Sequence, residues 1–272
     1  MRRVKNPQGL ETAIASFLSH QRTLGRSYTT EEYTLGRLQR FVVEQKADDL
    51  TASLYTRWCE TQHRISSNTL RGRQSVVRRF CLYRRRHEPR CFVPDPLFAR
   101  PRPYVEPVLI TEVHIARMLE VTDALRASSN SPLRSAVMRI AVVLLYTAGL
   151  RRGELVRLRL GDVDARGGVL RICDSKFHRS RLVPLSKDAH GELRHYLVRR
   201  LQSSYNQNLD APLLCNTHGG RCHGYTGAGI AHAIRRLFVQ AEVRDNEGRT
   251  PRVHDTRHSF ALQALIRSYR RV

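Results

Sequence analysis

Prolines gather in one stretch of this chain, and that stretch limits how the chain can fold more than any other feature. Six of the eleven prolines lie between residues 89 and 107. Proline lacks a backbone donor and stiffens an extended chain, so such a stretch suppresses helix. A length of 272 residues also suits two domains. We therefore predict domains at residues 1–98 and 109–272, joined by a Pro-rich linker at 99–108.

The charge balance points to a polyanionic partner. Lys and Arg total 47 against 24 Asp and Glu, a formal net charge of +23, and basic residues occur in both predicted domains. This balance is untypical of a general metabolic enzyme and favours nucleic acid over a membrane surface. Arginine, which grips phosphate with a flat fork, far outnumbers lysine, although a GC-rich genome would produce the same preference. We expect double-stranded DNA as the partner.

Cysteine usage and hydropathy indicate the compartment. Six scattered cysteines are too few to staple a chain of this size, which is typical of a reduced intracellular protein. No secretory signal is visible, and the longest apolar run, residues 140–150, is too short to span a membrane. We expect a bacterial cytoplasmic protein associated with the nucleoid. Cys215, His218, Cys222 and His223 resemble a zinc ligand set but match no common spacing, so we predict no metal and no other cofactor.

Hydrophobic periodicity predicts four helices between residues 10 and 90. The fourth, from about Ser67 to His87, has an apolar stripe and an opposite face rich in arginine. Like charges on one face repel one another unless an anion lies alongside. We therefore interpret this face as a contact with the DNA backbone rather than as a solvated surface. The predicted DNA-binding residues are Arg71, Arg73, Arg78, Arg79, Arg84, Arg85 and Arg86.

The second domain is predicted to be mainly α-helical with one small antiparallel β-sheet. Thr111 is expected to cap its first helix, and a long apolar helix is expected to end at Gly149 in the left-handed conformation. Two strand-like runs follow at residues 169–173 and 181–185. Further helices are predicted at about 188–202, at 227–240, and from His254 onward.

Three separated motifs in this domain suit phosphoryl chemistry. Residues 148–155 place Arg151 directly after a helix end, and Lys176 lies between the two strand-like runs. In residues 254–258, His254, Arg257 and His258 occupy positions i, i+3 and i+4 of one helix face. Preorganised guanidinium groups stabilise the charge that develops on a phosphodiester under attack, and lysine or histidine can protonate the leaving oxygen. The absence of an acidic cluster in the sequence argues against a two-metal nuclease.

Taken in order, these motifs resemble those of the tyrosine recombinase (phage-integrase-type) family, over nearly the whole chain. The resemblance implies a helical core-binding domain, a catalytic domain, and DNA strand breakage and rejoining through a phosphotyrosine bond. It also implies the site residues. Arg151 and Arg257 would hold the scissile phosphate, Lys176 would protonate the leaving 5′ oxygen, His254 would assist proton transfer, His258 would support the site, and Glu154 would be structural.

The sequence departs from the family pattern near its end. In the family, another His or Trp and then the tyrosine nucleophile follow the His-x-x-Arg motif by a few dozen residues. Here the printed sequence ends at Val272, and Tyr269 comes too early to match. We therefore expect a recombinase truncated before its nucleophile and inactive alone. The alternative is a catalytically silent DNA-binding regulator or partner subunit at recombination sites. On DNA, a homo- or hetero-oligomer is expected.

Overall fold

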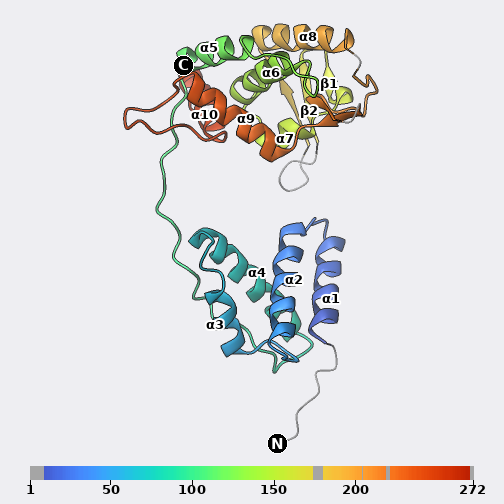
Figure 1. Ribbon diagram of the computed structural model, residues 1–272, viewed down its shortest axis with the longest axis vertical. Coiled ribbons are helices and arrows are strands. Elements are labelled where there is room, and N and C mark those ends of the chain that lie inside the picture. The colour runs from blue at the N-terminus through green and yellow to red at the C-terminus, as the bar shows by residue number, and fades with distance from the viewer. Residues whose placement is uncertain (1–8, 174–179, 204, 219–220, 270–272) are drawn as a thin grey trace, which may run out of the picture. The chain divides into compact units, whose positions relative to one another are not determined.

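Two compact units make up the chain, Met1–Val105 and Glu106–Val272 (Figure 1). The computed structural model describes residues 9–173, 180–203, 205–218 and 221–269. The boundary between the units falls in the Pro-rich segment, and each unit has a hydrophobic core of its own. Within the described residues, no helix has both the length and the apolar character that crossing a membrane requires.

The first unit consists of helices (Figure 1). They pack around aromatic side chains. Phe17 and Phe80 meet edge to face with ring centroids 5.7 Å apart, and Trp58 is buried in the same core. The four helices expected from the sequence are present, and together the aromatic and aliphatic stripes form one core. They are α1 (Leu10–Thr23), α2 (Thr29–Glu44), α3 (Ala52–Glu60) and α4 (Ser67–Arg85).

Arg84 lies inside this unit, so its prediction as an exposed DNA-binding residue is wrong. Its side chain is 4% exposed. The guanidinium binds both carboxylate oxygens of Asp49, at 2.5 and 3.0 Å, and contacts Oε2 of Glu88 at 2.7 and 2.9 Å. The physical reason is helical spacing, since Arg84 follows the buried Phe80 by four residues and Val77 by seven. It therefore continues the apolar face and needs acidic partners there.

The other arginines of α4 differ in what they contact. Arg73 donates to the Gln62 side chain and Arg78 to the Pro94 carbonyl, and both are half-buried. Arg79 is exposed, although it also donates to the Tyr28 hydroxyl at 3.1 Å. The arginines of this helix and its C-terminal end that keep exposed side chains are Arg71, Arg79, Arg85 and Arg86.

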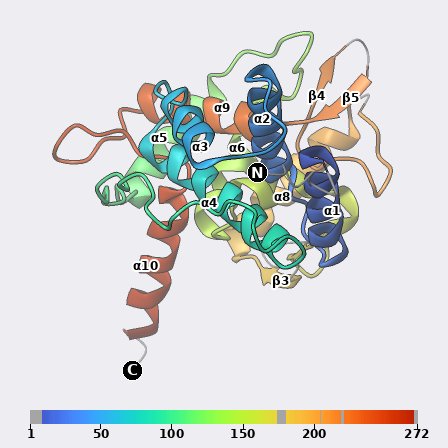
Figure 2. The same cartoon turned by 90° about the horizontal axis from the view of Figure 1, so that it is seen from below.

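A buried helix, α6 (Arg134–Thr147), lies at the centre of the second unit. The helices in contact with it include α5 (Glu112–Asp123), α8 (Lys187–Leu201), α9 (Gly227–Gln240) and α10 (Asp255–Tyr269). Thr111 caps α5 as expected, because its side chain accepts from the His114 backbone N–H at 3.3 Å. Figure 2 shows that the C-terminal half of α10 extends away from the rest of this unit.

An antiparallel sheet of order β1-β2-β3 covers part of this core. It contains β1 (Val163–Asp164), β2 (Val169–Ile172) and β3 (Arg181–Pro184), with Ile172 opposite Arg181. Both predicted strand-like runs are therefore paired strands. A second hairpin, β4 (Cys215–His218) with β5 (Arg221–Gly224), was not predicted from the sequence. These two strands are too polar to show a clear apolar alternation.

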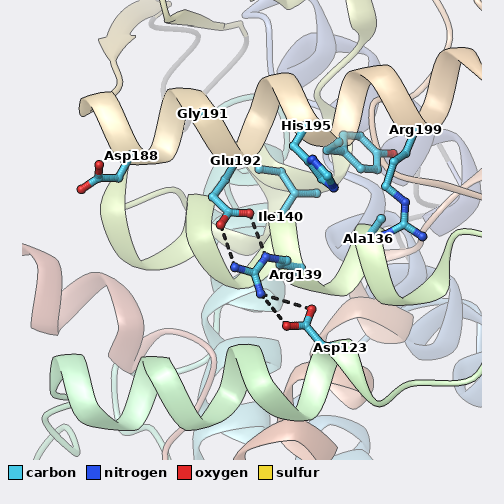
Figure 3. A pocket seen from close by; sticks show the side chains of 10 residues that line it. Asp123, Ala136, Arg139, Ile140, Asp188, Gly191, Glu192, His195 and Arg199 are labelled. Atoms are coloured by element: carbon cyan, nitrogen blue, oxygen red, sulfur yellow. Dashed lines mark hydrogen bonds and ion pairs between the residues drawn. The ribbon is translucent and has the colours of Figure 1, made fainter.

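Arg139 of α6 joins three helices on one side of the unit (Figure 3). It donates to Glu192 of α8 at 2.7 and 2.8 Å and to Asp123 of α5 at 2.9 and 3.1 Å. Hydrogen bonds from Arg139 lower the pKa of Glu192. These three charged residues line a cavity of about 580 Å³, and their charges are paired with one another. The cluster therefore fixes the spacing of α5 and α8 on α6.

Replacing Arg84 with Ala is expected to lower the free energy of unfolding of the first unit by about 2–4 kcal/mol, because it leaves two partly buried carboxylates without their cation. Arg85→Ala is the matched control, since Arg85 is the next residue and is exposed. The control should change stability by no more than about 0.5 kcal/mol. Urea unfolding of both variants measures the difference, and equal losses would contradict the internal role of Arg84.

Candidate active site

Gly149 directly follows α6 and determines how the chain enters the site. Its φ is +58°, in the left-handed region that glycine adopts freely. A Cβ atom at this position would lie 2.3 Å from Cδ1 of Phe260, a residue of α10. The Phe260 ring therefore packs directly on bare backbone. Both the φ angle and this contact require glycine here.

Arg151 begins the next helix, α7 (Arg152–Arg157), as its N-cap residue. Its extended backbone lets Glu154, at the third position of α7, accept the Arg151 backbone N–H at 2.9 Å. Glu154 Oε1 also accepts Arg151 Nη1 at 2.8 Å. Glu154 therefore fixes both the backbone and the side chain of Arg151.

The start of α10 brings the third motif to the same place. Arg257 Nη1 donates to the Gly149 carbonyl at 2.6 Å and lies 3.9 Å from Glu154 Oε2. The rings of His254 and His258 are 4.8 Å apart in a T-shaped arrangement, as their four-residue spacing on one helix face allows. The structure thus brings Arg151 and Arg257 to one carboxylate, although they are 106 positions apart in the sequence.

Glu154 is the buried centre of this arrangement, with a side chain only 1% exposed. Arg181, the first residue of β3, binds it with a fork, Nη1 to Oε1 at 3.0 Å and Nη2 to Oε2 at 2.8 Å. Burial alone would raise the pKa of Glu154, but the hydrogen bonds from Arg181 and Arg151 outweigh burial and lower it to about 2. The carboxylate is therefore ionised throughout the physiological range.

Positive charge exceeds negative charge at this point. Three guanidinium groups surround one carboxylate, and each keeps part of its side chain in solvent: 39% for Arg151, 35% for Arg181 and 32% for Arg257. Burial and the nearby Arg151 cation lower the pKa of Arg257, yet an arginine stays protonated in proteins. An open, preorganised group of cations with one internal counter-charge attracts an anion, and guanidinium forks match phosphate.

His254 supplies a different chemical function beside the arginines. Desolvation of its ring, followed by the charges of His258 and Arg257, lowers its pKa below the ordinary value of 6.5. Its imidazole is therefore mainly neutral at neutral pH. A neutral imidazole can accept a proton or pass one on, which an arginine cannot do.

Lys176 lies outside the described residues, and its role stays a prediction. The strands on either side of it end at Ile172 and begin at Arg181. The sequence did not reveal the contribution of Arg181, which was predicted only as the first residue of the second strand-like run. No local signal identifies this role, because its partner Glu154 is 27 residues away and belongs to a helix. Glu154 itself was predicted to be structural. In the structure it contacts Arg151, Arg181 and Arg257.

Comparison with known proteins gives the family. The model of the phage integrase family matches residues 110–269, more than half of the chain. The chain belongs to the phage integrase family. The match covers α5 through α10 and therefore contains every side chain placed around Glu154 above.

Named relatives agree with this membership. A putative integrase/recombinase of Sinorhizobium fredii, y4rB, is 30% identical over 259 residues, which cover 94% of this chain and 82% of the relative. The tyrosine recombinase XerC of Chromobacterium violaceum is 28% identical, with 94% and 82% covered. This family member is thus similar to integrases and tyrosine recombinases along both of its units.

Solved structures show the same fold at low sequence identity. The Tn1549 transposon integrase in complex with transposon right end DNA superposes with a TM-score of 0.65 and 15% identity, covering 94% of this chain and 86% of that one. Lambda integrase residues 75–356 bound to DNA gives a TM-score of 0.60 and 14% identity, covering 93% and 85%. The mainly α-helical fold with small antiparallel sheets is therefore that of the phage integrase family.

Gly149→Ala is expected to lower the free energy of unfolding of the second unit by about 2–4 kcal/mol. A side chain there adds both a strained positive φ and a clash with Phe260. Gly191→Ala is the control, because Gly191 lies within α8 with nothing within 4 Å of its added Cβ. That change should leave stability equal or raise it by up to about 1 kcal/mol. Thermal unfolding of both variants distinguishes them, and an unchanged Gly149→Ala would refute the close contact.

The low pKa of Glu154 predicts a pH-dependent contribution to stability. Its folded pKa of about 2 lies below the ordinary value of 4.5. Its stabilising effect is therefore fully present above pH 4.5 and is lost as the pH falls toward 2, by about 3 kcal/mol in total. Urea unfolding of wild type and Glu154→Gln over this range measures the effect. The gap in unfolding free energy between the two should narrow with acid, and a constant gap would contradict the ionised, paired carboxylate.

Proposed function

We propose that this chain acts on duplex DNA as a site-specific recombinase of the tyrosine type, which breaks and rejoins strands. One observation carries the proposal. Arg151 and Arg257 meet at the buried Glu154, with the neutral His254 at the start of the same helix as Arg257. Within a phage integrase family member, this group of side chains fits a phosphodiester under nucleophilic attack.

The geometry and charge of the site support the roles proposed for its described residues. Arg151 and Arg257 bind the non-bridging oxygens of the scissile phosphate and stabilise the extra negative charge that develops on them. His254, neutral at the start, takes part in proton transfer, and the ring of His258 packs against it and supports its orientation. Lys176 protonates the leaving 5′ oxygen, a role that rests on the family resemblance.

The first unit supplies contacts to the DNA backbone in this proposal. Its exposed arginines on and just after α4 (Arg71, Arg79, Arg85 and Arg86) are free of the internal ion pair that holds Arg84. Such residues neutralise phosphates without reading sequence. The proposal also places the chain with the nucleoid in a bacterial cytoplasm, as a homo- or hetero-oligomer on DNA.

The tyrosines favour a second candidate function, a DNA-binding subunit that does not cleave by itself. Tyr146 contacts Gln263, Tyr196 donates to the Leu213 carbonyl and Tyr225 hydrogen-bonds Ser131. Tyr205 is buried in the second unit. Tyr269 is exposed, but it follows Arg257 by twelve residues in one helix, a separation of about 18 Å along the axis. Within the described part of the second unit, no tyrosine hydroxyl is therefore presented to Arg151 and Arg257.

A nicked suicide duplex, from which a cleaved strand end dissociates, tests both candidates. With residues 1–272, the silent-subunit function predicts a band shift on DNA that carries the ends of the chain's own element and no covalent adduct after denaturation, whereas the recombinase function predicts both. An adduct lost in Tyr269→Phe would overturn the silent-subunit function and support cleavage. Absence of any band shift would contradict the recombinase proposal itself.

The role of Arg257 is checked on the same DNA. Arg257→Ala should weaken binding to the element's site more than to random duplex. Arg159→Ala is the control, because Arg159 is an exposed arginine paired with Asp210.

A further inference from the structure

Arg181 occupies the best hydrogen-bonding geometry that Glu154 offers. Its fork engages both carboxylate oxygens, at 3.0 and 2.8 Å. Arg151 contacts one oxygen through one Nη, at 2.8 Å, and Arg257 stays at 3.9 Å, beyond hydrogen-bond distance. Bidentate arginine–carboxylate pairs are among the strong hydrogen-bonded pairs in proteins. Among the described residues, Arg181 therefore supplies the only guanidinium fork to Glu154 and two of its four hydrogen bonds, the other two coming from the backbone N–H and Nη1 of Arg151.

We propose that Arg181 is a positioning residue that neutralises Glu154, so that Arg151 and Arg257 keep their N–H groups for a phosphate. The role rests on the proposed function, because it matters only if these two arginines bind an oxyanion. Arg181 acts through Glu154 and does not itself need to contact the substrate.

The consequence of removing Arg181 follows from the burial of Glu154. A carboxylate with 1% exposure requires hydrogen-bonding partners. Without Arg181, the nearest cations are Arg151 and Arg257, and the carboxylate would draw both toward itself. A carboxylate and a phosphate accept the same fork from arginine. Glu154 would then compete directly with the substrate phosphate for the two guanidinium groups.

Two other roles for Arg181 make different predictions. As a purely structural clip between β3 and α7, it would affect folding stability but not the affinity of the folded protein for an anion. If Arg181 were a direct phosphate ligand, its replacement would weaken anion binding whether or not Glu154 is charged. Only the positioning role predicts that removing the charge of Glu154 restores anion binding after Arg181 is lost.

The test uses tungstate, a tetrahedral oxyanion, titrated into the whole chain and followed by the side-chain Nε–H resonances of arginine. Wild type should show shifts at Arg151 and Arg257. Arg181→Gln should bind tungstate about tenfold more weakly, comparable to losing one charge-assisted hydrogen bond. The double variant Glu154→Gln with Arg181→Gln should recover most of that affinity, because Gln still accepts the Arg151 backbone N–H but carries no charge. Arg159→Gln, in an exposed ion pair with Asp210, should bind as wild type does.

Each contrary result has a distinct meaning. Equal tungstate affinity in Arg181→Gln and wild type would overturn the positioning role, and so would a double variant as weak as the single one. If wild type shows no shifts at Arg151 and Arg257, the proposed phosphate site fails, and the role of Arg181 fails with it. Should Arg181→Gln not fold, Arg181→Lys replaces it, alone and with Glu154→Gln. An ammonium keeps the charge but cannot form the fork, so an intermediate affinity is expected.

Discussion

The arginines of the candidate active site are positioned by their ion pairs with one buried carboxylate, that of Glu154. Glu154 joins the N-terminus of α7 to β3 by hydrogen bonds and faces Arg257 of α10. These segments are far apart in the sequence, so their meeting point depends on the whole core around α6. Burial strengthens each interaction because little water competes for the carboxylate. The same burial makes every partner necessary, since an unpaired charge there would be costly.

A steric constraint complements this electrostatic one. The carboxylate sets where the arginines point, whereas the contact between Gly149 and Phe260 sets how closely α10 approaches the end of α6. Arg257 is one turn before Phe260 on α10 and donates to the carbonyl of that same glycine. The motifs at residues 148–155 and 254–258 are therefore connected at Gly149, both by packing and by a hydrogen bond. A small change in either would move Arg257 relative to Arg151.

The sequence predicted the features that local patterns encode. The cap at Thr111, the left-handed Gly149 and the two strands around Lys176 follow from turn chemistry and alternation, and all are present. Arg84 was misassigned although its spacing from Phe80 was visible, because its charge was given more weight than its helical position. The fork between Arg181 and Glu154 was beyond prediction, since it depends on tertiary packing rather than on spacing. The polar β4–β5 hairpin was not predicted because its strands show no apolar alternation.

The internal ion pairs also change what the chain's number of basic residues means for binding. Arg84, Arg139 and Arg181 each face a carboxylate of the same molecule at 3.0 Å or less. A guanidinium already matched in this way displaces no condensed cation when a polyanion approaches, because its charge is balanced before the encounter. The number of counterions exchanged with a nucleic acid is therefore set by the basic side chains that are not already paired in this way. The total of 47 basic residues therefore overstates the cations available to a polyanion, whereas the net charge of +23 already subtracts the paired carboxylates.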